Sequence, residues 1–166
     1  MLKNKIAYMG LITALALVFS YAESLVPLYF AVPGIKLGLA NVVIVMALYQ
    51  MGFRDALIIS TTRVILAGFF FGNLMSILFS LAGCTLSLVV MNLLYKRESF
   101  SVMGVSIAGA VFHNIGQIIV AIIIVESFGV IYYFALLLIA ALVTGLIIGI
   151  LASEMIKRIK IMGDVR

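Results

Sequence analysis

The sequence predicts an all-helical integral membrane protein, and three observations support this fold class. Of the 166 residues, 66% are hydrophobic and only 10% are charged, against about 25% charged residues in soluble domains. The mean hydropathy is +1.34, and the apolar runs are continuous rather than alternating. Continuous runs favour helices over a membrane barrel, whose strands alternate between lipid-facing and lumen-facing residues. Helices also satisfy their own backbone hydrogen bonds, which lipid cannot do.

Charges, prolines and polar clusters divide the chain into six expected membrane helices, which form a single transmembrane domain over residues 1–166. Their expected bounds are about 6–26, 37–51, 55–71, 73–95, 102–125 and 130–156. A span needs about 20 residues, so the second and third helices are expected to be tilted, shielded or partly re-entrant. The first apolar run is too long for a secretory signal peptide, and five more apolar segments follow it.

The basic residues predict how the chain is oriented, because short cytoplasmic loops carry the excess of Lys and Arg. One side of the expected bundle carries nearly all of them: Lys3, Lys5, Arg54, Lys96, Arg97, Lys157, Arg158, Lys160 and Arg166. The other side has only Lys36. We therefore expect a multi-pass protein of the cell (cytoplasmic) membrane with both termini in the cytoplasm. The net charge of +5 is explained by topology, and no nucleic-acid partner is expected.

Polar side chains inside a membrane are costly, so each is a candidate functional residue. The candidates fall in the middle and outer part of the expected helices: Glu23, Lys36, Asn41, Arg63, His113, Asn114 and Gln117. Arg63 keeps its proton and needs an anionic or hydrogen-bonding partner, and Glu23 is the only acidic residue of the outer half within reach. Two interpretations stay open. The residues bind an acidic or carbonyl-rich small molecule with an apolar body, or they form a buried network that fixes helix register.

Other features of the sequence argue against metal or cofactor chemistry. Cys84 is the single cysteine and His113 the single histidine, so no set of ligands for a zinc site is present, and no cofactor is expected. Small residues recur at four-residue spacing, which lets helices approach closely. Within the first helix, Gly10, Ala14 and Ala16 are candidates for docking a membrane partner. The alternative, for these and for the other small residues at this spacing, is packing between the helices of this one bundle.

Three segments together resemble a known family. They are the run from Pro33 to Asn41 (PGIKLGLAN), Arg63, and the stretch from His113 to Gln117 (HNIGQ). The chain is similar over nearly its whole length to the Gx transporter family, also described as heptaprenyl diphosphate synthase component I. That family resembles the substrate-binding S components of energy-coupling factor (ECF) importers.

The resemblance implies an S-component-like bundle of six helices that captures a small molecule from outside. It also implies partners, a transmembrane T component and ATPase subunits. An enzyme is not expected, because prenyl diphosphate synthesis needs acidic clusters to hold magnesium, and Asp55 and Asp164 are the only aspartates. The alternatives are a membrane subunit of a redox or quinone-related assembly, a partner of a prenyl diphosphate synthase, and a channel or small secondary transporter.

Overall fold

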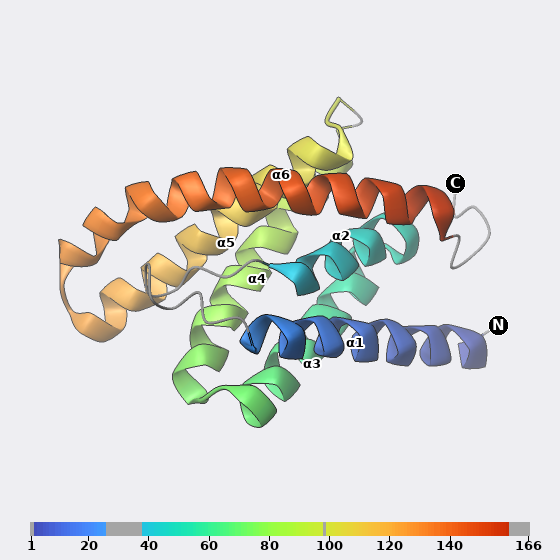
Figure 1. Ribbon diagram of the computed structural model, residues 1–166, viewed down its shortest axis with the longest axis horizontal. Helices are drawn as coiled ribbons and strands as arrows, with labels where there is room; N and C mark the ends of the chain where they lie inside the picture. The colour runs from blue at the N-terminus through green and yellow to red at the C-terminus, as the bar shows by residue number, and fades with distance from the viewer. Residues whose placement is uncertain (1, 26–37, 98, 160–166) are drawn as a thin grey trace.

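The structure, a computed structural model, describes residues 2–25, 38–97 and 99–159, and these form helices joined by short turns (Figure 1). In chain order the elements are α1 (Leu2–Ser24), α2 (Leu39–Met51), α3 (Phe53–Phe71), α4 (Leu74–Tyr95), α5 (Val102–Val125), the short 3-10 helix η2 (Phe128–Tyr133) and α6 (Phe134–Arg158). The predicted all-helical class with six helices is thus confirmed for the described residues. The expected bounds differ most at the first helix, which begins at Leu2, and at the last helix, which begins at Phe134. The 3-10 turn of η2 precedes α6, and there the hydroxyl of Ser127 accepts a hydrogen bond from the N–H of Gly129.

Four helices are long and apolar enough to cross a membrane. They are Lys5–Ser24, Leu74–Tyr95, Val102–Val125 and Phe134–Arg158. The protein is therefore a membrane protein with several transmembrane helices, but a count of six spans is not established. With 13 residues, α2 reaches only about 20 Å at 1.5 Å per residue, short of a hydrocarbon core of about 30 Å.

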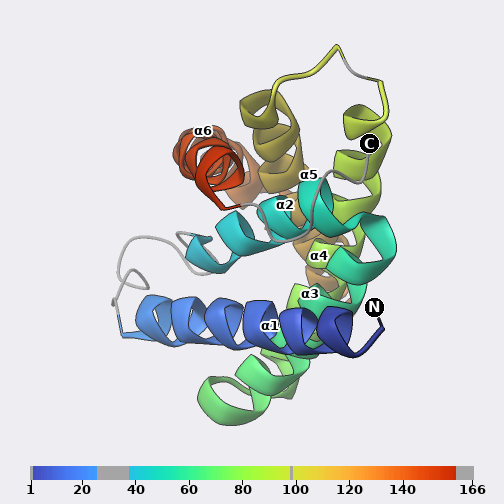
Figure 2. The ribbon, with the colours of Figure 1, turned by 90° about the vertical axis from the view of Figure 1, so that its right-hand side faces the viewer.

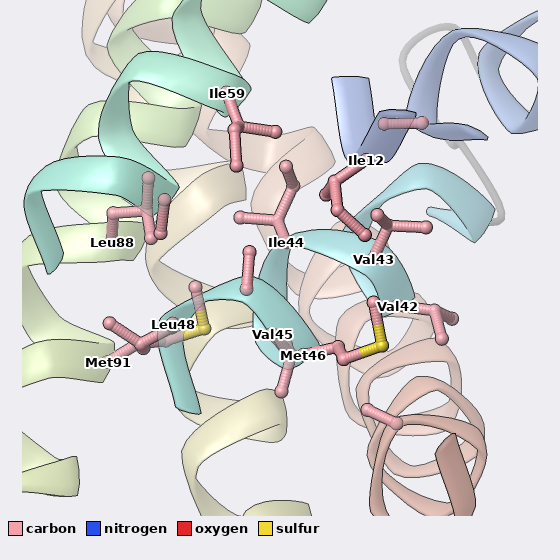
Figure 3. Packing of buried hydrophobic residues seen from close by; sticks show 14 of the residues in the cluster. Ile12, Val42, Val43, Ile44, Val45, Met46, Leu48, Ile59, Leu88 and Met91 are labelled. Atoms are coloured by element: carbon pink, nitrogen blue, oxygen red, sulfur yellow. The ribbon is translucent and has the colours of Figure 1, made fainter. Parts of the chain in front are cut away.

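The short helix α2 forms the centre of the bundle. Every residue from Val42 to Leu48 is buried, so this helix is apolar on all sides. It packs against α1, α3 and α6, and both ribbon views place it between α1 and α6 (Figure 2). Ile12 of α1, Ile59 of α3 and Leu88 of α4 close the core around it (Figure 3).

Contacts with α6 show where α2 begins along the length of the bundle. A methyl group built on Gly38, the residue before α2, would lie 2.8 Å from Cδ1 of Ile148, which lies past the middle of α6. At the other end of α2, the side-chain amide of Gln50 donates to the backbone carbonyl of Ile159. Because α2 runs beside only the second half of α6, its first residues lie in the interior of the bundle.

Glycines allow α4, α5 and α6 to pack closely. A Cβ on Gly116 would lie 2.7 Å from the carbonyl oxygen of Ala82, and one on Gly149 would lie 2.7 Å from Cα of Met103. The small residues of these helices therefore serve internal packing. On α1, in contrast, Gly10 has no neighbour within 4 Å, and Gly10 and Ala14 are exposed while Ala16 is fully buried.

One end of the bundle gathers the basic residues, and we call it the basic end. It consists of the start of α1, the turn between α2 and α3, and the last turns of α4 and α6. Lys5 forms an ion pair with Asp55 at 2.9 Å, and the rings of Tyr49 and Tyr95 meet edge to face with centroids 4.6 Å apart. These contacts bring together the segments that the sequence assigns to the cytoplasm.

Candidate functional site

A small polar cavity lies where α2 begins. Its volume is about 50 Å³, and α1, α2, α3, α4, α5 and α6 all contribute to its wall. The residues that line it are Glu23, Gly38, Ala40, Asn41, Arg63, Ser80, Ala110, His113, Asn114, Gln117, Ala140, Ala141, Thr144 and Ile148. Its wall therefore combines polar side chains with glycine, alanine and one isoleucine.

Six of the seven polar residues expected from the sequence line this cavity. They come from four helices: Glu23 from α1, Asn41 from α2, Arg63 from α3, and His113, Asn114 and Gln117 from α5. The seventh, Lys36, lies outside the described residues. The structure thus brings together the described candidates, while their part in binding a ligand stays a prediction.

Among the described residues of the cavity wall, Arg63 is the one Lys or Arg. Its Nε is buried and has no hydrogen-bond partner among the described residues. No ion pair joins it to a described carboxylate, although Glu23 and Cys84 lie close enough to interact with it electrostatically. Cys84, on α4, is itself 3% exposed. A buried guanidinium of this kind is expected to need a hydrogen-bonding anion.

Glu23 makes a different contact from the one that the sequence suggests. Its Oε1 accepts a hydrogen bond of 2.6 Å from the backbone N–H of Gly38. Gly38 has φ of 75°, a left-handed conformation that glycine adopts without strain. The carboxylate therefore connects the end of α1 to the start of α2, instead of pairing directly with Arg63.

The polar residues of α5 are held in place by neighbouring helices. The side-chain amide of Asn114 donates to the backbone carbonyl of Leu137 on α6 at 2.8 Å. His113 packs directly over Gly83 of α4, where an added Cβ would lie 2.9 Å from the imidazole Cε1. These contacts fix the face of α5 that lines the cavity.

Two hydroxyl groups of the wall were not among the candidates. Ser80 and Thr144 line the cavity, and the hydroxyl of Thr144 donates to the backbone carbonyl of Ala140 one turn earlier. Short hydroxyl side chains are common inside membrane helices because they hydrogen-bond to their own backbone. Their positions in the sequence therefore gave no signal that they face a cavity.

The wall has no obvious place for a metal ion. Among the described residues, no group of three or more His, Cys, Asp or Glu side chains lies close enough to hold a metal. The described part of the wall instead offers one guanidinium, one carboxylate, three amides, an imidazole and two hydroxyls. Such a set can hydrogen-bond a polar group in an otherwise apolar surrounding.

A second, larger hollow lies near the basic end. It has a volume of about 330 Å³ and is formed by α1, α2 and α6. Its lining is almost wholly apolar and includes Phe19, Val42 and Leu151. Glu154 and Arg158, which form an ion pair with each other, lie at its rim.

The fold and the cavity define a helical membrane protein with a polar site inside its bundle. A family model described as heptaprenyl diphosphate synthase component I matches residues 12–155. The chain therefore belongs to this family, as the sequence resemblance indicated. No curated protein and no solved structure matches the chain.

Proposed function

We propose that this chain is a substrate-binding membrane subunit, similar to the S component of an ECF importer. It captures a small anionic or carbonyl-rich molecule with an apolar body. The observation that supports this proposal is the cavity at the start of α2, whose wall contains Arg63 with an Nε that has no hydrogen-bond partner among the described residues.

Charged and amide side chains are costly inside a membrane bundle, so a cavity lined by them is expected to serve a structural or a binding function. If the polar residues only fixed the register of the helices, they would be expected to satisfy one another. Nε of Arg63 has no such partner among the described residues, and Glu23 bonds to backbone. A ligand that hydrogen-bonds Arg63 would supply the missing partner.

The proposed direction of capture is from the outer side. The basic end carries Lys5, Arg54, Lys96, Arg97, Lys157 and Arg158, and the positive-inside rule assigns such an end to the cytoplasm. Both termini would then be cytoplasmic. The cavity begins where α2 begins, away from the basic end, so the shortest route to it is from outside.

Import would need other subunits. The sequence has no G-x-x-x-x-G-K-[ST] motif to bind the phosphates of ATP, so a transmembrane T component and ATPases would supply the energy. Gly10 and Ala14 on the exposed face of α1 are the proposed contact with such a partner. Ala16 faces the core in this structure, so it would contribute only if α1 changed its packing.

The family description favours a second candidate function. By that description, this chain would be the membrane component of a heptaprenyl diphosphate synthase, or a subunit of a related quinone assembly. We propose a non-catalytic role in this case too. Asp55 pairs with Lys5, and Asp164 is the only other aspartate, so the chain offers no cluster of aspartates to hold magnesium diphosphate.

Native mass spectrometry of the protein, gently purified from its own membranes, tests both functions. We expect a co-purified small molecule that is lost in Arg63→Ala and in Asn114→Ala, with helix content unchanged. Arg97→Ala is the matched control, because Arg97 is an exposed arginine that lines neither the cavity nor the second hollow. Ligand-free protein that carries only prenyl synthase or redox subunits would refute the binding function and support the second candidate.

A further inference from the structure

We infer that the start of α2 and Arg63 form a binding position for one carboxylate group, and that Glu23 competes for this position in the ligand-free protein. The inference rests on the proposed function and specifies the charge of the ligand and the role of Glu23. Three features of the cavity support this inference.

The first feature is the free start of α2. The first N–H groups of any helix lack partners within the helix, and they attract anions through the helix dipole. Here the N–H of Asn41 bonds to the carbonyl of Gly38, and the N–H of Gly38 bonds to Glu23. No side chain caps α2, and the N–H groups of Leu39 and Ala40 have no partner among the described residues. Ala40 lines the cavity.

The second feature is Arg63, which lines the same cavity as Gly38 and Ala40. Its Nε is buried and unpartnered among the described residues. A guanidinium holds a carboxylate best through two parallel hydrogen bonds, and such bonds are strongest where water is excluded. The guanidinium and the helix start therefore offer hydrogen-bond donors and positive charge to one small space.

The third feature is the position of Glu23. Its carboxylate accepts a hydrogen bond from the N–H of Gly38. It also lies near Arg63 without forming an ion pair with it. Glu23 thus places a negative charge beside the site without satisfying Arg63. A carboxylate that bound to Arg63 and Ala40 would be repelled by Glu23, which makes Glu23 a competitor and not a ligand-binding group.

The size of the cavity agrees with a single carboxylate. A volume of about 50 Å³ is several times the roughly 10–15 Å³ that a single water needs by the same measure, so the cavity has room for a carboxylate group. Ala110, Ala140 and Ala141 form an apolar part of the wall. A short aliphatic chain attached to the carboxylate has an apolar surface to lie against there.

Thermal-shift titration of the full chain in detergent tests the inference, with butanoate as the probe and butanamide as its uncharged counterpart. We expect butanoate, and not butanamide, to raise the melting temperature of the wild type. Glu23→Gln keeps an acceptor for Gly38 and removes the charge, so it should lower the apparent Kd for butanoate by about fivefold or more. Arg63→Gln should abolish the effect, and Arg63→Lys should restore part of it.

Three results would overturn the inference: equal shifts with butanamide, weaker butanoate binding in Glu23→Gln, or an unchanged shift in Arg63→Gln. Glu23→Ala provides a second test if Glu23→Gln does not fold, and it should tighten butanoate binding as well. If these results appear while native mass spectrometry still finds a ligand that depends on Arg63, the carboxylate position is wrong and the binding function stands. If neither butanoate nor a co-purified molecule binds, both are wrong.

Discussion

The carboxylate of Glu23 and the backbone N–H of Gly38 form a hydrogen bond of 2.6 Å between the end of α1 and the start of α2. This bond gives the one acidic side chain among the described residues of the cavity wall a partner in the backbone. Nε of Arg63, in the same wall, has no hydrogen-bond partner among the described residues. The two opposite charges of the site therefore have different roles, which can be separated by substitution.

Arg63→Met should stabilise the ligand-free protein. Removing a buried charge that has no partner relieves its desolvation cost, and replacing buried charges by apolar side chains gains about 1 kcal/mol or more in favourable cases. We expect a higher melting temperature in detergent and no binding of ligand. A lower melting temperature would instead indicate that Arg63 belongs to a structural network with Glu23.

Gly116→Ala should destabilise the contact between α4 and α5. The new Cβ would lie 2.7 Å from the carbonyl oxygen of Ala82, and a backbone atom cannot move aside as a side chain can. We expect a loss of about 1–3 kcal/mol in the free energy of unfolding. Gly104→Ala is the control on the same helix, because its nearest neighbour would lie at 3.7 Å. Equal melting temperatures for the two variants would contradict this packing.

Gly52→Ala should destabilise the turn between α2 and α3 although nothing lies within 4 Å of the new methyl group. The cause is the backbone, since φ of 87° and ψ of 174° form a conformation that is essentially restricted to glycine. We expect a cost of about 1–3 kcal/mol. Gly10→Ala meets equally open space within α1, where alanine is favoured, so it should leave the melting temperature unchanged or slightly raised. The comparison separates backbone strain from steric contact.

Asp55→Asn should loosen the basic end of the bundle. Asp55 is 7% exposed and pairs with Lys5, so its loss leaves a cation without its partner next to the core. We expect a cost of about 1–3 kcal/mol, measured as reduced thermal stability. Breaking the exposed pair of Lys157 and Glu154 with Lys157→Met should leave the melting temperature nearly unchanged, because solvent screens such a pair. Similar effects of the two substitutions would show that the pair of Lys5 and Asp55 is not buried enough to matter.

The sequence predicted which residues meet at the cavity because charge and amides are rare inside membrane helices. Arg63, His113 and Asn114 stand out in apolar segments, and the bundle brings them together. Thr144 and Ser80 did not stand out, because short hydroxyl side chains are common in membrane helices, where they can bond to their own backbone as Thr144 does.

The role of Glu23 and the depth of α2 could not be predicted from the sequence. An acidic residue near an arginine suggests an ion pair, but the contact with Gly38 depends on where α2 begins in three dimensions. Length alone indicated that this helix is short. Its central place in the core follows from contacts with α1, α3 and α6, and the last of these is distant from α2 in the sequence.

Cys84 offers a native measure of how often this bundle opens. It is the single thiol of the chain, it is almost completely buried, and it lies near Arg63. A thiol reagent can reach such a side chain only during excursions from the closed form, so its reaction rate reports the population of those excursions. The chain thus carries a kinetic reporter of its interior, with no engineered label.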